Sequence, residues 1–468
     1  MKMIPSRFKS GTLGALALAS SLGFAAEIQA GAAFVHLFEW KWNDIAAECE
    51  NFLGPKGFEA VQISPPNEHI VHDTWWARYQ PVSYKLNSRG GTEQELRNMI
   101  ERCHAAGVKI HADLVFNQTA VWGDGGTGTA GTRWTPRNHP GLYGFNHYHN
   151  SGFDISASDY ANHAHRVWIG KLTGLPDLNT GSDYVRQKIA DYVNKLEEMG
   201  VDGFRIDASK HIAPGDIQAI LEKAGKPWAF LEVIGADGQA SELQPSNYTH
   251  LGLVTEFKYG TDVAANFRGQ IEYLRTLGEG WGLLPSDRAL VFIDNHDRER
   301  GHGGGGNLTY KDGPTYNLAN VFMLAFPYGY PKVHSGYKFD NTDAGPPGDA
   351  DCEKNQGEWA CQHRWGNIAN MVGFRNHTLG AWSVDNWWDN GNNAIAFGRG
   401  DKGFVVINND TGDLNETLST GLPPGEYCNI LAADEECSGN IITVDGNGKA
   451  HFELSGKSAA AIHGGARP

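Results

Sequence analysis

Carboxylate side chains stand beside apolar runs in several parts of the sequence, in an arrangement that could carry acid–base chemistry. Arg205 lies inside one apolar run that ends at Asp207, Glu232 lies within a second, and Asp297 closely follows a third. A buried arginine is costly without a counter-charge, and Asp207, two residues on, points to the same face of a strand. A structural ion pair would explain these two residues alone. Carboxylates at the ends of several strands instead indicate a catalytic cluster.

Two carboxyl groups on either side of an acetal are what the hydrolysis of a glycosidic bond requires. One must be protonated to donate to the leaving oxygen, and the other must be ionised to attack or to guide water. Arg205 would favour the ionised form of Asp207, whereas the apolar neighbours of Glu232 would favour its protonated form by desolvation. We therefore predict that Asp207 is the nucleophile and Glu232 the acid/base. Asp297 would bind sugar hydroxyls and stabilise the transition state.

The elements that must position these residues alternate between short apolar runs and helix-like stretches. Eight strands that alternate with helices predict a (β/α)₈ barrel, in which catalysis takes place at the carboxyl ends of the strands. The expected strands are residues 34–38, 60–63, 108–116, 201–206, 228–233, 253–256, 289–293 and 330–334. The expected helices are residues 45–52, 92–106, 183–199, 216–224 and 321–326.

Two segments depart from this alternation. Residues 117–176 are rich in Gly, Thr, Asn and His and have no helical period, so we expect an inserted, loop-rich subdomain after the third strand. From residue 379 onward, short β-rich runs are separated by turn residues, which predicts a C-terminal all-β sandwich. The predicted barrel therefore consists of residues 31–116 and 177–378, and the sandwich of residues 379–468.

The first 30 residues have the three parts of a secretory signal peptide. Lys2, Arg7 and Lys9 precede the apolar, small-residue run 13–24, and alanines follow it. This run is too short to span a membrane, and we find no other candidate. We therefore expect a secreted protein without a membrane anchor.

The net charge excludes some classes of binding partner, and the number of cysteines predicts disulfide bonds. A formal charge of −15 repels nucleic acid and anionic membranes, so we expect neither as a partner. Six cysteines in an exported chain suggest three disulfides, for which many pairings are possible. Short spacing favours two small loops and leaves one long-range pair. The hypothesis is Cys352–Cys361, Cys428–Cys437 and Cys49–Cys103.

Four motifs in order resemble the α-amylases of glycoside hydrolase family 13, and the resemblance covers nearly everything after the leader. Residues 301–306 and 327–332 are most similar to the chloride-dependent animal and bacterial group. The resemblance implies a monomeric, endo-acting enzyme that cleaves internal α-1,4 bonds of starch, glycogen or maltooligosaccharides with retention. The motifs are Asp113–Asn117, Gly203–His211, Glu232–Ile234 and Phe292–Asp297.

The resemblance also implies further site residues. It assigns Asp207, Glu232 and Asp297 the same three roles as above. It places substrate contacts at Trp75, Trp76, Tyr79, Gln80, Arg205, Lys210, His211, His296 and His302. Aromatic rings suit the apolar face of a sugar, although Trp75 and Trp76 could instead be a core pair.

Two ions follow from the same resemblance. Asn117, Asp177 and the backbone carbonyl of His211 would hold a calcium ion that joins the inserted segment to the barrel. Arg205, Asn295 and Lys332 would hold chloride, and because a lysine cannot grip in a bidentate way, we expect weak chloride binding.

One departure and two alternatives remain open. Gln118 stands where the family usually has histidine, which puts one hydroxyl contact in doubt. The same catalytic set would also serve a maltooligosaccharide-forming or transglycosylating enzyme. A non-catalytic glucan-binding relative is disfavoured because all three carboxylates are present.

Overall fold

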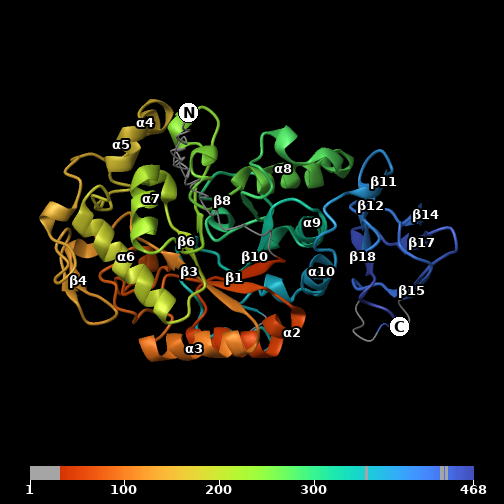
Figure 1. Ribbon diagram of the computed structural model, residues 1–468, viewed down its shortest axis with the longest axis horizontal. Coiled ribbons are helices and arrows are strands. Elements are labelled where there is room, and N and C mark those ends of the chain that lie inside the picture. The colour runs from red at the N-terminus through yellow and green to blue at the C-terminus, as the bar shows by residue number, and fades with distance from the viewer. Residues whose placement is uncertain (1–31, 354–356, 433–436, 438–440) are drawn as a thin grey trace, which may run out of the picture.

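The computed structural model describes residues 32–353, 357–432, 437 and 441–468, so the predicted signal peptide lies outside the described residues. Eight parallel strands close into a barrel in the order β1-β10-β9-β8-β7-β6-β3-β2, which confirms the predicted barrel. Figure 1 shows these strands at the centre of the larger part of the molecule. Their bounds are β1 Phe34–Leu37, β2 Ala60–Ile63, β3 Lys109–Leu114, β6 Gly203–Ile206, β7 Ala229–Leu231, β8 Leu253–Thr255, β9 Ala289–Val291 and β10 Tyr330–Ser335.

Helices surround the barrel and cover its apolar strands (Figure 1). The predicted helix at 92–106 begins with the expected capping box, in which Thr92 and Glu95 bond each other's backbone. We did not predict α8 and α10, because both contain several Gly, Asn or β-branched residues that are weak helix formers. The helices are α1 Trp42–Glu48, α2 Gly54–Lys56, α3 Glu93–Ala105, α6 Asp183–Glu198, α7 Pro214–Lys223, α8 Phe257–Arg268, α9 Pro314–Ala325 and α10 Gly366–His377. Among the described residues, no helix is long and apolar enough to cross a membrane.

The segment after β3 forms short elements at the end of the molecule opposite the C-terminal domain (Figure 1). They are β4 Gly126–Thr127, β5 Arg133–Trp134, α4 Ala157–Asn162 and α5 Ala164–Ile169. Buried Glu68 ties this segment to the barrel, because its Oε1 accepts the N–H groups of Ala130 and Thr132 at 2.9 Å each. The segment is therefore folded onto the barrel rather than left as a free loop.

The C-terminal region is the predicted all-β domain, built from two four-stranded antiparallel sheets. We missed β11 and β17, although the alternating burial of β17 follows its sequence pattern. One sheet contains β11 Asp385–Asp389, β12 Ala394–Arg399, β13 Gly403–Asn408 and β18 Ser458–His463. The other contains β14 Leu414–Ser419, β15 Gly425–Cys428, β16 Ile441–Val444 and β17 Lys449–Leu454.

Three disulfides have the predicted pairing, Cys49–Cys103, Cys352–Cys361 and Cys428–Cys437. The C-terminal domain is joined to the barrel by the fully buried Arg399 at the end of β12. Its guanidinium donates to the carbonyl oxygens of Ala325 at 2.5 Å and Ala381 at 2.7 Å. The bond to Ala325 satisfies a backbone carbonyl at the C-terminal end of α9. The two bonds together hold the first sheet of the C-terminal domain against the barrel.

We expect Arg399→Met to lower the free energy of unfolding by about 3 kcal/mol, because at least two buried carbonyl oxygens lose their donor. Thermal unfolding monitored by calorimetry would measure the loss. Arg133→Met removes an exposed arginine of β5 and serves as the control. Equal stability of the two variants would contradict this role for Arg399.

Candidate active site

One guanidinium at the carboxyl end of the barrel contacts three carboxyl groups. Arg205 Nη1 lies 2.6 Å from Asp113 Oδ1 and 2.9 Å from Asp207 Oδ1, and its Nη2 lies 2.5 Å from Glu232 Oε1. Asp113 and Arg205 are opposite each other in the β3–β6 register. The backbone N–H groups of Asp207 and Glu232 still bond the preceding strands, so both residues follow directly on β6 and β7. Strand register thus brings together groups that are far apart in the sequence.

Backbone geometry after β6 adds a second link between the two predicted catalytic carboxyls. Ala208 has a φ of 48°, in the left-handed region, and its N–H donates to Glu232 Oε2 at 2.9 Å. Left-handed backbone is unfavourable for a residue other than glycine and is typical of functional sites. The residue after Asp207 therefore helps to orient Glu232.

The charges of this cluster do not balance in the absence of substrate. Burial raises the pKa of Asp113 and raises that of Asp207 well above its ordinary value, although Arg205 opposes both shifts. Burial and the nearby Glu232 raise the pKa of Asp297 to about 7. One shared cation cannot hold all these carboxyls ionised, so the cluster retains protons near neutral pH.

Two expectations about these environments need correction. Arg205 does not by itself keep Asp207 ionised, because it is shared with Asp113 and Glu232 and burial outweighs it. Glu232 is not in purely apolar surroundings, since its two oxygens contact Arg205 and the Ala208 N–H. Asp207 and Glu232 therefore differ in their hydrogen-bond partners, and not in being in a polar and an apolar environment.

Aromatic rings line one side of the cluster. The His296 ring stacks on Tyr79 at 5.5 Å and lies edge-on to Trp75 at 5.6 Å, while the Tyr79 hydroxyl donates to Asp113 at 2.9 Å. Burial keeps His296 neutral by lowering its pKa, and its Nε2 lies 3.6 Å from Asp297 Oδ2. Trp75 is 7% exposed, and its indole N–H donates to the Thr342 carbonyl. Most of this side chain is therefore part of the hydrophobic core, and only a small part faces the carboxylate cluster.

The other predicted substrate contacts differ in their burial and in their partners. Gln80 is buried and accepts two backbone N–H groups of the inserted segment. His302 is exposed, with its ring 6.3 Å from that of Trp75. Lys210 bonds Gln239, and burial lowers its pKa to about 8. Half-exposed Trp76 lies further out along the same short helix, Trp75–Tyr79.

The structure also brings in residues that we did not predict. Arg300 donates to the His296 carbonyl at 2.9 Å and to Glu299 at 3.3 Å, and its guanidinium lies 5.6 Å from the Trp75 ring. Glu299 in turn bonds His334 of β10 at 2.9 Å. A dense run of charges directly after Asp297 was the sequence signal that could have revealed them.

The residues predicted for calcium lie where the inserted segment meets β3 and the segment after β6. Asp177 is 2% exposed, and its Oδ1 has no hydrogen-bond partner among the described residues. Burial raises its pKa to about 7, against the opposing bond to His149 at 2.6 Å. Leu178 N–H bonds the Asn117 carbonyl, which places Asn117 beside Asp177. An orphaned buried carboxylate oxygen suits a bound cation.

His211 and Gln118 connect this region to the active site. The His211 ring accepts or donates one bond to Tyr160 of α4 at 2.8 Å, and burial lowers its pKa to about 4. Gln118 is buried and uses both ends of its amide on protein, bonding the Tyr79 carbonyl at 3.1 Å and Asn117 at 3.0 Å. Its position therefore favours a structural role over a sugar contact. Among the described residues, no cluster of three His, Cys, Asp or Glu residues could hold a metal.

The residues predicted for chloride are Arg205 of β6, Lys332 of β10 and Asn295, which follows β9. Lys332 of β10 is buried and has no carboxylate within ion-pair distance among the described residues. Burial and the repulsion of Arg205 lower its pKa to about 7. Asn295 accepts the Arg298 N–H through its carbonyl oxygen, which leaves its amide N–H groups as donors. Two cations and an amide donor fit an anion.

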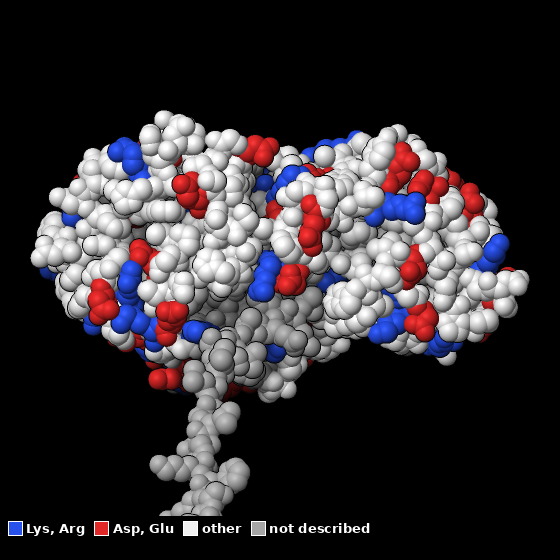
Figure 2. Space-filling view, turned by 45° about the horizontal axis from the view of Figure 1, so that its top comes forward, with Lys and Arg blue, Asp and Glu red and all other residues white. Residues whose placement is uncertain are grey.

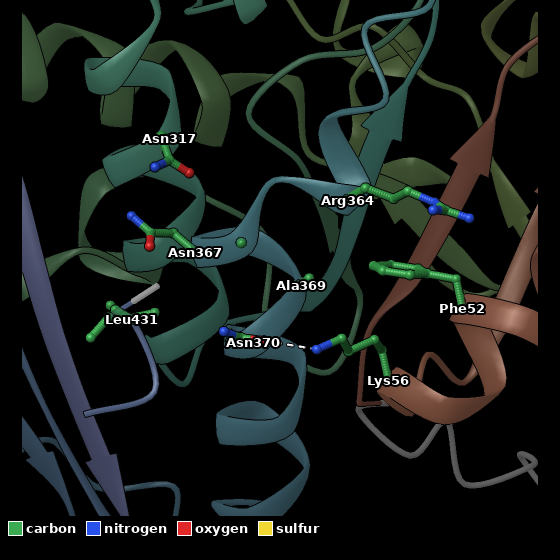
Figure 3. A pocket seen from close by; sticks show the side chains of 10 residues that line it. Phe52, Lys56, Asn317, Arg364, Asn367, Ala369, Asn370 and Leu431 are labelled. Carbon is green, nitrogen blue, oxygen red and sulfur yellow. Dashed lines mark hydrogen bonds between the residues drawn. The ribbon is translucent and has the colours of Figure 1, made fainter. Parts of the chain in front are cut away.

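The charge distribution on one face of the molecule and a pocket remote from the Arg205 cluster are two further features that could indicate a site. On the face in Figure 2, acidic and basic side chains are interspersed among a larger area of other residues. A separate pocket lies between α2, α10 and a C-terminal loop, where Lys56 donates to Asn370 at 3.1 Å and Arg364 lies over Phe52 (Figure 3). No carboxylate of the Arg205 cluster lines this pocket.

Comparisons with known proteins decide the family. The model described as "Alpha amylase, catalytic domain" matches residues 52–226, and that described as "Alpha amylase, C-terminal all-beta domain" matches residues 385–465. An α-amylase of Aeromonas hydrophila is 56% identical over 391 residues, which cover 82% of this chain and 86% of that protein. The chain belongs to the α-amylase family. It is therefore a glycoside hydrolase.

Other α-amylases match over most of the chain. Human α-amylase 1B is 45% identical over 491 residues, covering 93% of this chain and 95% of the human protein. The structure of α-amylase I from Eisenia fetida superposes with a TM-score of 0.86 at 40% identity, covering 92% of this chain and 97% of that one. A mutant of the same Eisenia α-amylase has been solved as a maltohexaose complex, with the same TM-score.

Proposed function

We propose that this chain is a secreted, monomeric, endo-acting α-amylase that cleaves internal α-1,4-glucosidic bonds of starch, glycogen or maltooligosaccharides with retention. The observation that carries the proposal is that one guanidinium, Arg205, binds both Asp207 and Glu232 at the carboxyl ends of neighbouring strands. Retaining enzymes need their two carboxyls about 5–5.5 Å apart, and a shared guanidinium favours such a close pair. The signal-peptide pattern of the leader supports secretion.

In the proposed reaction, Asp207 attacks the anomeric carbon while Glu232 donates its proton to the leaving glycosidic oxygen. The bond between that carbon and oxygen breaks, and an ester between the sugar and Asp207 forms. Glu232, now a carboxylate, takes a proton from water, whose oxygen attacks the same carbon and releases Asp207. The two displacements together retain the configuration.

The remaining residues orient the sugar at the reacting bond. Asp297 and the neutral His296 would accept and donate bonds to hydroxyl groups, and the negative charge of ionised Asp297 would stabilise the positive sugar ring of the transition state. Tyr79 and Trp75 present aromatic surface to the apolar face of the same ring. Tyr79 is fixed for this role by its bond to Asp113, which also binds Arg205.

We expect Asp207→Asn to lower kcat on soluble starch by roughly a thousandfold or more while starch binding remains. The amide keeps the shape of the carboxylate but cannot form the ester. Asp191→Asn, on the outer helix α6, is the matched control and should keep full activity. NMR of the first products made by the unmodified enzyme should show α-anomers, and analysis of longer products would reveal transglycosylation. Substantial activity of Asp207→Asn, or first products that are β-anomers, would contradict the mechanism.

Asn117, Asp177 and the His211 carbonyl would hold calcium, and the orphaned Oδ1 of Asp177 supports this assignment. The ion would join the inserted segment to the segment after β6 and supply structural stabilisation rather than chemistry.

Calcium affinity should rise as the pH rises through about 7, because Asp177 must lose its proton to bind the ion. Calorimetric titration of chelator-treated protein at pH 5.5 and pH 8 would measure this. Asp177→Asn should bind calcium at least tenfold more weakly, while Asp183→Asn, at the exposed start of α6, should bind it normally. Equal affinity in both variants would rule out the assignment.

Chloride would lie near Arg205, Asn295 and Lys332. Lys332 supports this placement because it is buried and has no carboxylate within ion-pair distance in the part of the chain that the structure describes. A bound anion close to Glu232 would favour its protonated form at neutral pH by repulsion.

Chloride activation should weaken as the pH rises above about 7, because Lys332 loses the charge that attracts the anion. In Lys332→Arg the guanidinium stays charged, so we expect tighter chloride binding and little change between pH 6.5 and pH 8.5. Activity titrated with chloride at both pH values would test this. Undiminished activity at neutral pH after exhaustive removal of chloride would contradict the proposal.

A further inference from the structure

Three aromatic side chains form a cluster outside the wall that lines the carboxylates. The rings of His72 and Trp76 stack at 5.0 Å with an angle of 22°. The Trp122 ring lies 5.0 Å from Trp76 and 5.2 Å from His72. Trp122 is 52% exposed, which is unusual for the largest apolar side chain. No role proposed above uses it.

The backbone of Trp122 is held by a residue of the active-site wall. Gln80 Oε1 accepts the N–H groups of both Val121 and Trp122 at 3.0 Å, and Gln80 directly follows the short helix that carries Trp75 and Trp76. The chain then turns sharply, because Gly123, Asp124 and Gly125 all have positive φ values. Asp124 adopts this conformation readily, because aspartate is one of the few residues besides glycine that tolerate left-handed backbone.

We propose that Trp122 forms an outer glucan-binding subsite, in which its exposed indole stacks against a glucose ring of a long substrate; this rests on the proposed function. His72 covers one face of Trp76, so Trp122 presents the free aromatic surface of the cluster. The flat, apolar C–H face of a pyranose matches an indole with little loss of hydration. Because the Gln80 bonds fix the backbone in advance, little ordering is needed on binding.

The position of Trp122 predicts which substrates it affects. His296 contacts Trp75, the next residue along the chain is Trp76, and Trp122 lies beyond it. The proposal therefore puts the sugar on Trp122 outside the units that Asp207 and Glu232 bind on either side of the cleaved bond. On this placement we expect long maltooligosaccharides and amylose to use Trp122, and short oligosaccharides at the reacting carboxylates not to contact it.

The experiment compares kcat/KM for maltotriose and for maltoheptaose. Trp122→Ala should lower kcat/KM for maltoheptaose by roughly fivefold to tenfold, as expected for loss of one stacked aromatic contact, and leave that for maltotriose unchanged. Trp122→Phe should recover part of the loss. Trp382→Ala removes a tryptophan with similar exposure, 48%, and should change neither value. The ratio of the two values does not depend on how much of a variant is folded.

Each outcome bears on the subsite. An equal fall for both substrates would mean that Trp122 only supports Gln80, and no change for either would mean that the indole is unused; both overturn the proposal. If the unmodified protein cleaves neither substrate, the proposed function fails by itself. The subsite would then be judged by calorimetric binding of maltoheptaose, which Trp122→Ala should weaken by the same factor and Trp382→Ala should not.

Discussion

The site depends on the sharing of one buried guanidinium among three carboxyl groups. Arg205 is placed by β6, Asp113 by β3 and Glu232 by the end of β7, so the closure of the barrel is what brings the charges together. Because a single positive charge faces a larger negative one in a buried setting, protons must remain in the cluster. Lys332 of β10 is near enough to Arg205 for their repulsion to lower its pKa.

The segment inserted after β3 is coupled to the site through several short contacts. Gln118 joins Asn117 to the Tyr79 carbonyl, Tyr160 bonds His211, and Gln80 accepts the N–H groups of residues 121 and 122. Three independent contacts therefore connect the inserted segment to the aromatic wall and to the segment that follows Asp207.

Local patterns in the sequence predicted the barrel strands, the capping box at Thr92 and Glu95, and the three disulfide pairs. They also predicted Asp207 directly after a strand, but they placed Glu232 inside the expected strand 228–233, whereas β7 ends at Leu231. They did not predict α8 and α10, whose weak helix formers are stabilised by packing against the barrel. The sharing of Arg205 and the Ala208–Glu232 bond could not be predicted either, because register and a positive φ arise only from the closed fold. The contacts of Trp122 with His72 and Trp76 could not be predicted, because the Gly-rich sequence around Trp122 does not indicate which residues its side chain contacts.

The left-handed backbone at Ala208 has a consequence for how substitutions at this site combine. The Ala208 N–H has its acceptor in Glu232, so replacing Glu232 with an apolar residue would remove the proposed proton donor and also the hydrogen-bond partner of the residue after Asp207. The kinetic defect of such a variant would contain a conformational part that belongs to Asp207. A double-mutant cycle on Asp207 and Glu232 would therefore give a large coupling energy. The sum of the activity losses of the two single variants would exceed the activity loss of the double variant.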